Sequence, residues 1–151
     1  NMINNNITEF MAKDLIVFNP DTDIKQAIKV MVKNKISGAP VVDFQGTLVG
    51  VLSEKDCLKP IVDAYYHQRP GGTGIVGDYM STSVKSLLSS KTLMDAAYEF
   101  VNSSFKRFPV VDHTGKLLGQ ISRSDALRVI SDFSPDFKQV PDTWKVREPQ
   151  F

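Results

Sequence analysis

The fold is decided by Pro40-Val41-Val42-Asp43 followed, a short turn later, by Gly50-Val51-Leu52-Ser53-Glu54-Lys55-Asp56. The same pattern returns as Pro109-Val110-Val111-Asp112 and Gly119-Gln120-Ile121-Ser122-Arg123-Ser124-Asp125, where Gln120 is a slight departure from the apolar positions. In both places a β-rich segment, a turn and a second β-rich segment lead into Ser-x-x-Asp, which is typical of a helix start. The duplicated pattern therefore carries candidate chemistry as well as packing.

The duplication extends far beyond these motifs. Residues 10–61 match residues 79–130 in register and without a gap, so that Met11 matches Met80. A period of this length that occurs only twice is too long and too few for a solenoid. It predicts two copies of one small α/β unit that face each other and enclose a cleft at their junction.

Each copy predicts the same order of elements. In the first copy, residues 15–18 form a short apolar run that indicates a strand, and Thr22 is a suitable N-cap for an amphipathic helix. Residues 39–43 and 48–52 are β-rich and flank a turn, which indicates a hairpin. A second helix is expected from residue 53 to about residue 66. The unit is β-α-β-β-α, and the fold class is α+β.

The domain boundaries follow from the repeat. The first repeat is expected over residues 1–66 and the second over residues 79–131, with the two forming one module. Residues 67–78 contain Pro-Gly-Gly-Thr-Gly and are expected to be a flexible connector. Residues 132–151 contain several prolines and little periodicity, so they are expected to be a tail along the surface or against a partner.

Composition narrows the class of protein. The chain has 151 residues, 42% hydrophobic and 23% charged, which fits one small module and leaves no room for a catalytic domain. A net charge of +1 disfavours a nucleic-acid partner. Its single cysteine, Cys57, suits a reducing cytoplasm, and no apolar run is long enough for membrane insertion. His67 and His113 stand alone, so neither a metal site nor a catalytic set is expected.

The Ser-x-x-Asp motifs allow two interpretations. At a helix start, the serine and the carboxylate can form a capping box and nothing more. Alternatively, an ionised aspartate beside free N–H groups can accept both hydroxyls of a ribose, while the helix N-terminus favours a nearby phosphate. The motif occurs twice, and Lys106-Arg107 precedes the second copy. These two facts favour the ligand interpretation, more strongly for Asp125 than for Asp56.

The whole pattern resembles the CBS domain pair, a regulatory module named after cystathionine β-synthase. The resemblance rests on the x-Pro-Val-Val-Asp segment and the Gly-x-x-Ser-x-x-Asp motif, each present twice, and covers most of the chain. It implies two repeats packed through their sheets about a pseudo-two-fold axis, and a homodimer formed through the helices. It also implies clefts that bind adenosine-containing ligands.

The resemblance assigns residues to two nucleotide sites. In the main site, Lys106 and Arg107 would bind the phosphate, Ser122 and Asp125 the ribose, and residues of the first copy the adenine. The main-site residues are Met11, Ile16, Ile36, Ser37, Gly38, Lys106, Arg107, Ile121, Ser122 and Asp125. The second, weaker site comprises Leu52, Ser53, Asp56, Lys85 and Phe105.

The second site is expected to be weaker for two reasons. Ser37-Gly38 stands where the main site has Lys106-Arg107, and Lys85 stands where the main site has Ile16. The predicted function is therefore a non-catalytic sensor of AMP, ADP or ATP, without a cofactor, that signals to an unidentified target protein. Two alternatives are a purely structural dimerisation module and a module that senses Mg²⁺. A third, an enzyme fragment, is disfavoured because no catalytic constellation is found.

Overall fold

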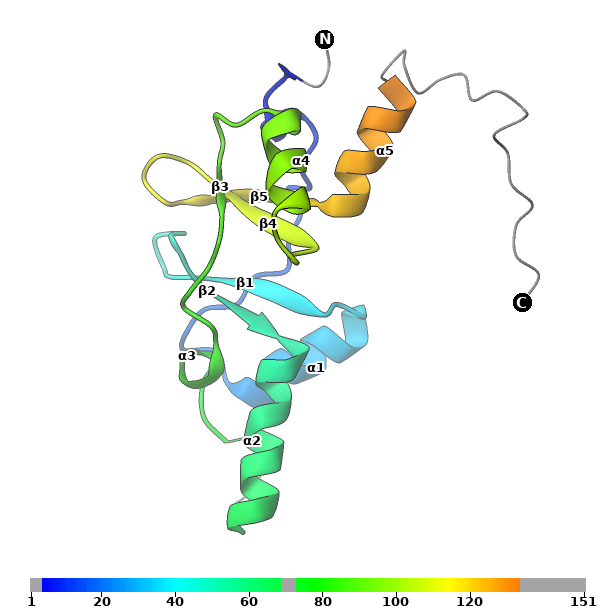
Figure 1. Cartoon of the computed structure of the whole chain (residues 1–151). Helices are drawn as coiled ribbons and strands as arrows, with labels where there is room; N and C mark the ends of the chain where they lie inside the picture. The colour runs from blue at the N-terminus through cyan, green and yellow to red at the C-terminus, as the bar shows by residue number, and fades with distance from the viewer. Residues whose placement is uncertain (1–3, 69–72, 134–151) are drawn as a thin grey trace, which may run out of the picture.

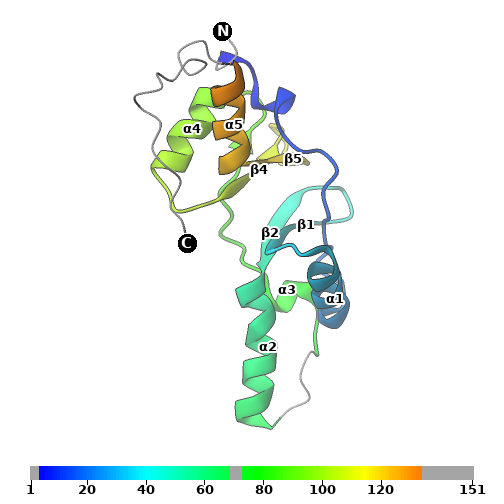
Figure 2. The same ribbon diagram turned by 90° about the vertical axis from the view of Figure 1, so that its right-hand side faces the viewer.

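Two β-hairpins lie at the centre of the structure, one from each repeat, and the longer helices lie on their outer sides (Figure 1). The computed structural model describes residues 4–68 and 73–133. The first half contains α1 (Ile24–Asn34), β1 (Gly38–Val42), β2 (Leu48–Ser53) and α2 (Glu54–His67). The second half contains α3 (Val76–Tyr79), β3 (Leu87–Leu88), α4 (Leu93–Val101), β4 (Arg107–Val111), β5 (Leu117–Ser122) and α5 (Arg123–Phe133). The predicted α+β fold of two repeats packed through their sheets is confirmed (Figure 2).

The hairpins are built alike. β1 pairs with β2 and β4 pairs with β5 in antiparallel register, and each pair has an irregularity before its last residue pair. Gly46 and Gly115 occupy the turns with φ of +85° and +89°, a conformation that costs glycine little. The turns also bond to each other, because Leu48 N–H donates to Gly115 O and Leu117 N–H donates to Gly46 O. The hairpins are thus joined at their turn ends.

Two local predictions are wrong. Residues 15–18 form no strand, and Phe18 makes only an isolated parallel bridge to Val41. The segment before this run lies against the second repeat, where Ala12 exchanges backbone hydrogen bonds with Gln120. The N-cap of α1 is Asp23, whose side chain accepts from the N–H of Gln26, and not Thr22.

The two halves exchange short segments. Ile7, in the 3-10 helix η2 (Ile7–Glu9), is fully buried in the core of the second repeat with Leu93 and Phe108. Val76 of α3 is fully buried in the core of the first repeat. Each repeat therefore depends on the lead-in segment of the other, and the halves are coupled through packing as well as through backbone bonds.

The lead-in segments cross the hairpins at the repeated glycines. A Cβ atom at Gly119 would lie 2.6 Å from the carbonyl oxygen of Ala12 and 2.6 Å from Met11 Sδ. A Cβ atom at Gly50 would lie 2.9 Å from the carbonyl oxygen of Ser81. Only glycine permits these approaches, which bring the segments after Met11 and Met80 against the opposite hairpins.

Candidate functional site

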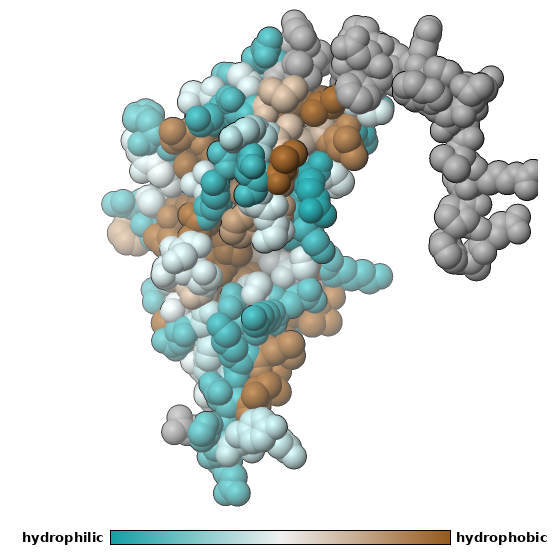
Figure 3. Space-filling view, viewed as in Figure 1, coloured by the Kyte–Doolittle hydropathy of each residue, from teal (hydrophilic) through white to brown (hydrophobic). Residues whose placement is uncertain are grey.

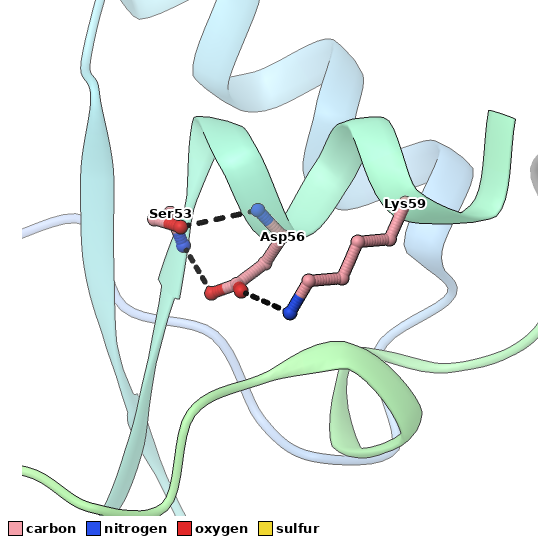
Figure 4. A network of polar contacts seen from close by, with 3 residues as sticks. All are labelled: Ser53, Asp56 and Lys59. Atoms are coloured by element: carbon pink, nitrogen blue, oxygen red, sulfur yellow. Dashed lines mark hydrogen bonds and ion pairs between the residues drawn. The ribbon is translucent and has the colours of Figure 1, made fainter. Parts of the chain in front are cut away.

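The first Ser-x-x-Asp motif forms the N-terminus of α2 (Figure 4). Asp56 N–H donates to Ser53 Oγ at 3.1 Å, and Ser53 N–H donates to Asp56 Oδ2 at 3.0 Å. The other carboxylate oxygen, Oδ1, pairs with Lys59 Nζ at 3.3 Å. The capping box considered from the sequence is thus present. It fixes a nearly buried carboxylate whose second oxygen pairs with a lysine that is 56% exposed.

A cavity of about 310 Å³ opens beside this helix start, between the two repeats. One wall comes from β1, β2 and the start of α2. The rest of the lining comes from residues 81–85 and 105–107, from Pro109 of β4 and from Gln120 of β5. The size is at the lower end of the range for small-molecule sites. The cavity therefore combines a carboxylate of one repeat with side chains of the other.

Cationic side chains outnumber anionic ones in the lining of the cavity. Lys85, Lys106 and Arg107 are cationic, and Asp56 is the anionic side chain among the lining residues. Lys85 Nζ lies 2.7 Å from Glu99 Oε2, so its charge is largely offset by a group on α4. Arg107 Nη1 donates to Ser37 Oγ, a neutral acceptor, at 2.9 Å. Lys106 and Arg107 consequently provide the positive potential that would attract an anion.

The cavity combines members of both predicted sites. Its lining includes four residues assigned to the main site, Ser37, Gly38, Lys106 and Arg107. It also includes four assigned to the second site, Ser53, Asp56, Lys85 and Phe105. Ser122 and Asp125 do not line this cavity. Leu52 and Ile121 are fully buried in the two cores, and Met11, Ile16 and Ile36 pack against those cores.

The second Ser-x-x-Asp motif is more open. Asp125 N–H donates to Ser122 Oγ at 3.1 Å, and Asp125 Oδ1 pairs with Arg128 Nη2 at 3.0 Å. The Asp125 side chain is 40% exposed, against 10% for Asp56. Hydrogen bonding with the Ser122 side chain, assisted by Arg128, lowers the pKa of Asp125 below its ordinary value. Asp125 is therefore an ionised acceptor at neutral pH.

Some lining residues were not predicted. They are Ala39, Pro40, Val51, Ser81, Ser83, Val84, Pro109 and Gln120. Several of these residues could have been predicted from the alignment of the two repeats. Ser81 to Val84 match Ala12 to Leu15, which lead up to the predicted wall residue Ile16. The hydroxyls of Ser81 and Ser83 add polar groups to a wall where only Lys85 was expected.

Other reactive groups do not form a site. Burial, with smaller contributions from Asp56 and Glu54, raises the pKa of the Cys57 thiol, which favours its unreactive protonated form. Within residues 4–68 and 73–133, no group of three His, Cys, Asp or Glu residues is placed to hold a metal ion. No helix in the same ranges is long and apolar enough to cross a membrane.

Comparisons with known proteins point to one family. The sequence model of the CBS domain matches the chain twice, over residues 7–63 and 76–132. The protein MJ1426 of Methanocaldococcus jannaschii is 32% identical, with 82% of this chain and 90% of that protein covered. MJ1225 of the same organism is 28% identical over 97% of this chain, which spans only 49% of that relative.

The plant protein CBSX2 links the family to a ligand. This chloroplastic CBS domain-containing protein of Arabidopsis thaliana is 32% identical over 81% of this chain and 62% of its own length. The crystal structure of CBSX2 in complex with AMP superposes with a TM-score of 0.72 and 34% identity. The superposition covers 84% of this chain and 96% of that chain. The resemblance inferred from the repeated motifs is confirmed.

Proposed function

The chain belongs to the CBS domain family, and from this membership we propose that it is a regulatory module that binds an adenosine nucleotide between its repeats. Binding changes the surface that the two repeats present, and a partner protein reads the change. The module itself performs no catalysis. Its buried free Cys57 suits a reducing compartment such as the cytoplasm.

The observation that carries the proposal is that Asp56, Lys106 and Arg107 line the same cavity. A nucleoside phosphate has two neighbouring ribose hydroxyls, which an ionised carboxylate accepts, and a phosphate, which an arginine fork binds. The AMP complex of CBSX2 supports an adenosine ligand of this kind. The ribose would displace Lys59, whose side chain is 56% exposed, from Asp56.

The two Ser-x-x-Asp motifs give two places for the nucleotide. The sequence ranks the Asp125 site first because Lys106 and Arg107 precede that motif. We place the first nucleotide in the Asp56 cavity, since the same two cations line it together with a nearly buried carboxylate. The two assignments make opposite predictions for substitutions of the two aspartates.

The test is calorimetry of the full chain with AMP, ADP, ATP and adenosine. Replacing Asp56 with asparagine removes charge-assisted hydrogen bonds worth about 1.5–3 kcal/mol, so affinity should fall roughly 10- to 100-fold. Asp125→Asn should reduce affinity less. A matched control is Asp95→Asn, since Asp95 forms the same capping box with Thr92 but does not line the cavity. It should change stability and leave affinity intact.

Three outcomes would contradict the proposal. Absence of binding for every adenosine ligand at millimolar concentration would reject nucleotide binding. Equal affinity losses in Asp56→Asn and Asp95→Asn would show that the effect is capping alone. A larger loss in Asp125→Asn than in Asp56→Asn would restore the ranking predicted from the sequence.

We also propose that the module is a homodimer, formed through its helices. Apolar side chains gather on the outside of the helices in both halves (Figure 3). On α2, Leu58, Ile61 and Val62 are 58%, 49% and 48% exposed, and Leu127 of α5 is 69% exposed. Exposed apolar patches of this kind mark interaction surfaces.

A further inference from the structure

Arg107 lies close to both Ser-x-x-Asp motifs. Its backbone lies beside the Asp125 motif, and its side chain extends to the Asp56 motif. We propose that its guanidinium is a single phosphate ligand shared by two nucleotide sites. A nucleotide held at Asp56 then weakens the binding of a second nucleotide at Asp125. This inference rests on the proposed nucleotide binding and adds a coupling between the two sites.

The backbone of Arg107 lies beside the Asp125 motif. Arg107 is the register partner of Ser122 at the end of the β4–β5 hairpin. The carbonyl of the preceding residue, Lys106, accepts from the N–H of Arg123 at 2.8 Å, at the start of α5. An arginine at this position could extend toward a phosphate bound at the Asp125 motif.

The side chain of Arg107 instead reaches the Asp56 motif of the other repeat. Its Nη1 donates to Ser37 Oγ at 2.9 Å. The carbonyl of Ser37 accepts from the N–H of Glu54 at 2.9 Å, at the start of α2. Arg107 therefore lines the same cavity as Ser53 and Asp56.

The arrangement is not reciprocal. Gly38 of the first repeat occupies the position that matches Arg107, and it has no side chain to send toward the second repeat. One guanidinium therefore lies between two motifs. A guanidinium fork pairs bidentately with one phosphate at a time, so a phosphate at Asp56 withholds it from Asp125. Adenosine has no phosphate and should not experience this competition.

The experiment is calorimetry of the full chain, with the ratio of the second to the first dissociation constant as its readout. For AMP this ratio should exceed the ratio for adenosine by about tenfold or more, the loss expected for charge-assisted hydrogen bonds. Arg107→Ala should bring the AMP ratio down to the adenosine ratio.

A second variant covers the case in which Arg107→Ala does not fold. Ser37→Ala removes only the hydroxyl that holds the guanidinium at the Asp56 side. It should lower the AMP ratio toward the adenosine ratio measured in the same variant. Equal ratios for AMP and adenosine in the wild-type protein would overturn the shared ligand, as would an AMP ratio that neither Arg107→Ala nor Ser37→Ala changes. Failure of both AMP and adenosine to bind would instead reject the proposed function itself.

Discussion

At the scale of single residues, Asp56 and Asp125 show how one motif acquires two environments. Both follow a serine by three positions, and both accept a cation one turn later along the helix. Asp56 is nearly buried beside a cavity, whereas the Asp125 side chain is 40% exposed. The same motif therefore gives a nearly buried acceptor in the first repeat and a more exposed one in the second.

Asp125 should make the stability of the folded protein depend on pH. Its pKa is lowered in the folded protein, by Ser122 first and by Arg128 next. Its stabilising contribution is therefore present above the ordinary aspartate pKa of about 3.9 and is lost as the pH falls through the lower folded value. The difference in melting temperature between wild type and Asp125→Asn should shrink as the pH is lowered through this window.

Melting curves of both proteins between acidic and neutral pH test this directly. Arg128→Gln removes one of the two groups that lower the pKa, so the pH-dependent part of the difference should become smaller in that background. A difference between wild type and Asp125→Asn that is the same at every pH would show that Asp125 acts only as a neutral cap.

The sequence could predict these residues but not their neighbours. Ser-x-x-Asp is visible in both copies, and a capping box was among the interpretations it allowed. Ser37 and Arg107 were assigned to one site from the sequence, but the hydrogen bond between them was not predictable, and neither was the pairing of Lys85 with Glu99. Each contact joins a residue of a connecting segment to a helix or strand, and the bond from Arg107 to Ser37 also joins different repeats. Such contacts depend on how the hairpins stack.

At the scale of elements, the glycine in each second hairpin strand decides where the lead-in segments cross. A side chain at Gly119 would meet the backbone oxygen of Ala12 and the sulfur of Met11, both at 2.6 Å. The methionine can move, but the carbonyl is held by the bond that Gln120 N–H donates to it. Gly119→Ala should therefore destabilise the protein by about 1–3 kcal/mol, as overpacking usually does.

Denaturant unfolding of Gly119→Ala and of a neighbouring control tests this expectation. Leu118 is 39% exposed on the same strand, so Leu118→Ala should have a smaller effect. If Gly119→Ala were as stable as wild type, the crossing segment would not be held against the hairpin as the structure shows. Gly50→Ala, opposite Ser81, should behave like Gly119→Ala.

Elements were predictable where a local pattern decides them. The hairpins followed from β-rich segments around Gly46 and Gly115. Apolar periodicity predicted α1 and α4, and the Ser-x-x-Asp motifs predicted α2 and α5. The short helix α3 was missed, because it begins in the segment that was expected to be a flexible connector. The strand expected at residues 15–18 was wrong because only Phe18, the last residue of that run, pairs with β1, at Val41. The burial of Ile7 and Val76 in opposite repeats was not visible, since an exchanged segment has the same apolar pattern as one that packs at home.

At the scale of the whole molecule, the two repeats present matching apolar grooves on their helical sides. One groove is lined by Ile28, Val32, Ile36, Leu58 and Ile61 from the first repeat. The groove of the second repeat is lined by Ala97, Val101, Ala126, Leu127 and Ile130. Because the same surface can serve on two chains, these grooves suit an isologous contact in a closed dimer.

The proposed dimer leads to a prediction for Leu58. Wild-type protein should have twice the 16.8 kDa mass of one chain by light scattering at tens of micromolar. Leu58→Asp puts a charge into the proposed contact, where burying it unpaired is costly, so this variant should be a monomer. Leu58 is already 58% exposed in one chain, and the variant should therefore keep its fold.

A control separates this surface from general loss of apolar character. Phe44 is 90% exposed at the tip of the first hairpin and lines neither helical groove, so Phe44→Asp should remain a dimer. A monomeric mass for wild type with and without AMP, or an unchanged dimer in Leu58→Asp, would exclude the helical contact. If the module dimerises through this contact, α2 and α5, which follow Ser53 and Ser122, contribute to both the nucleotide sites and the dimer contact. Their N-termini face the candidate nucleotide sites and their outer sides face the second chain, so a nucleotide that shifts either helix start also shifts the dimer contact.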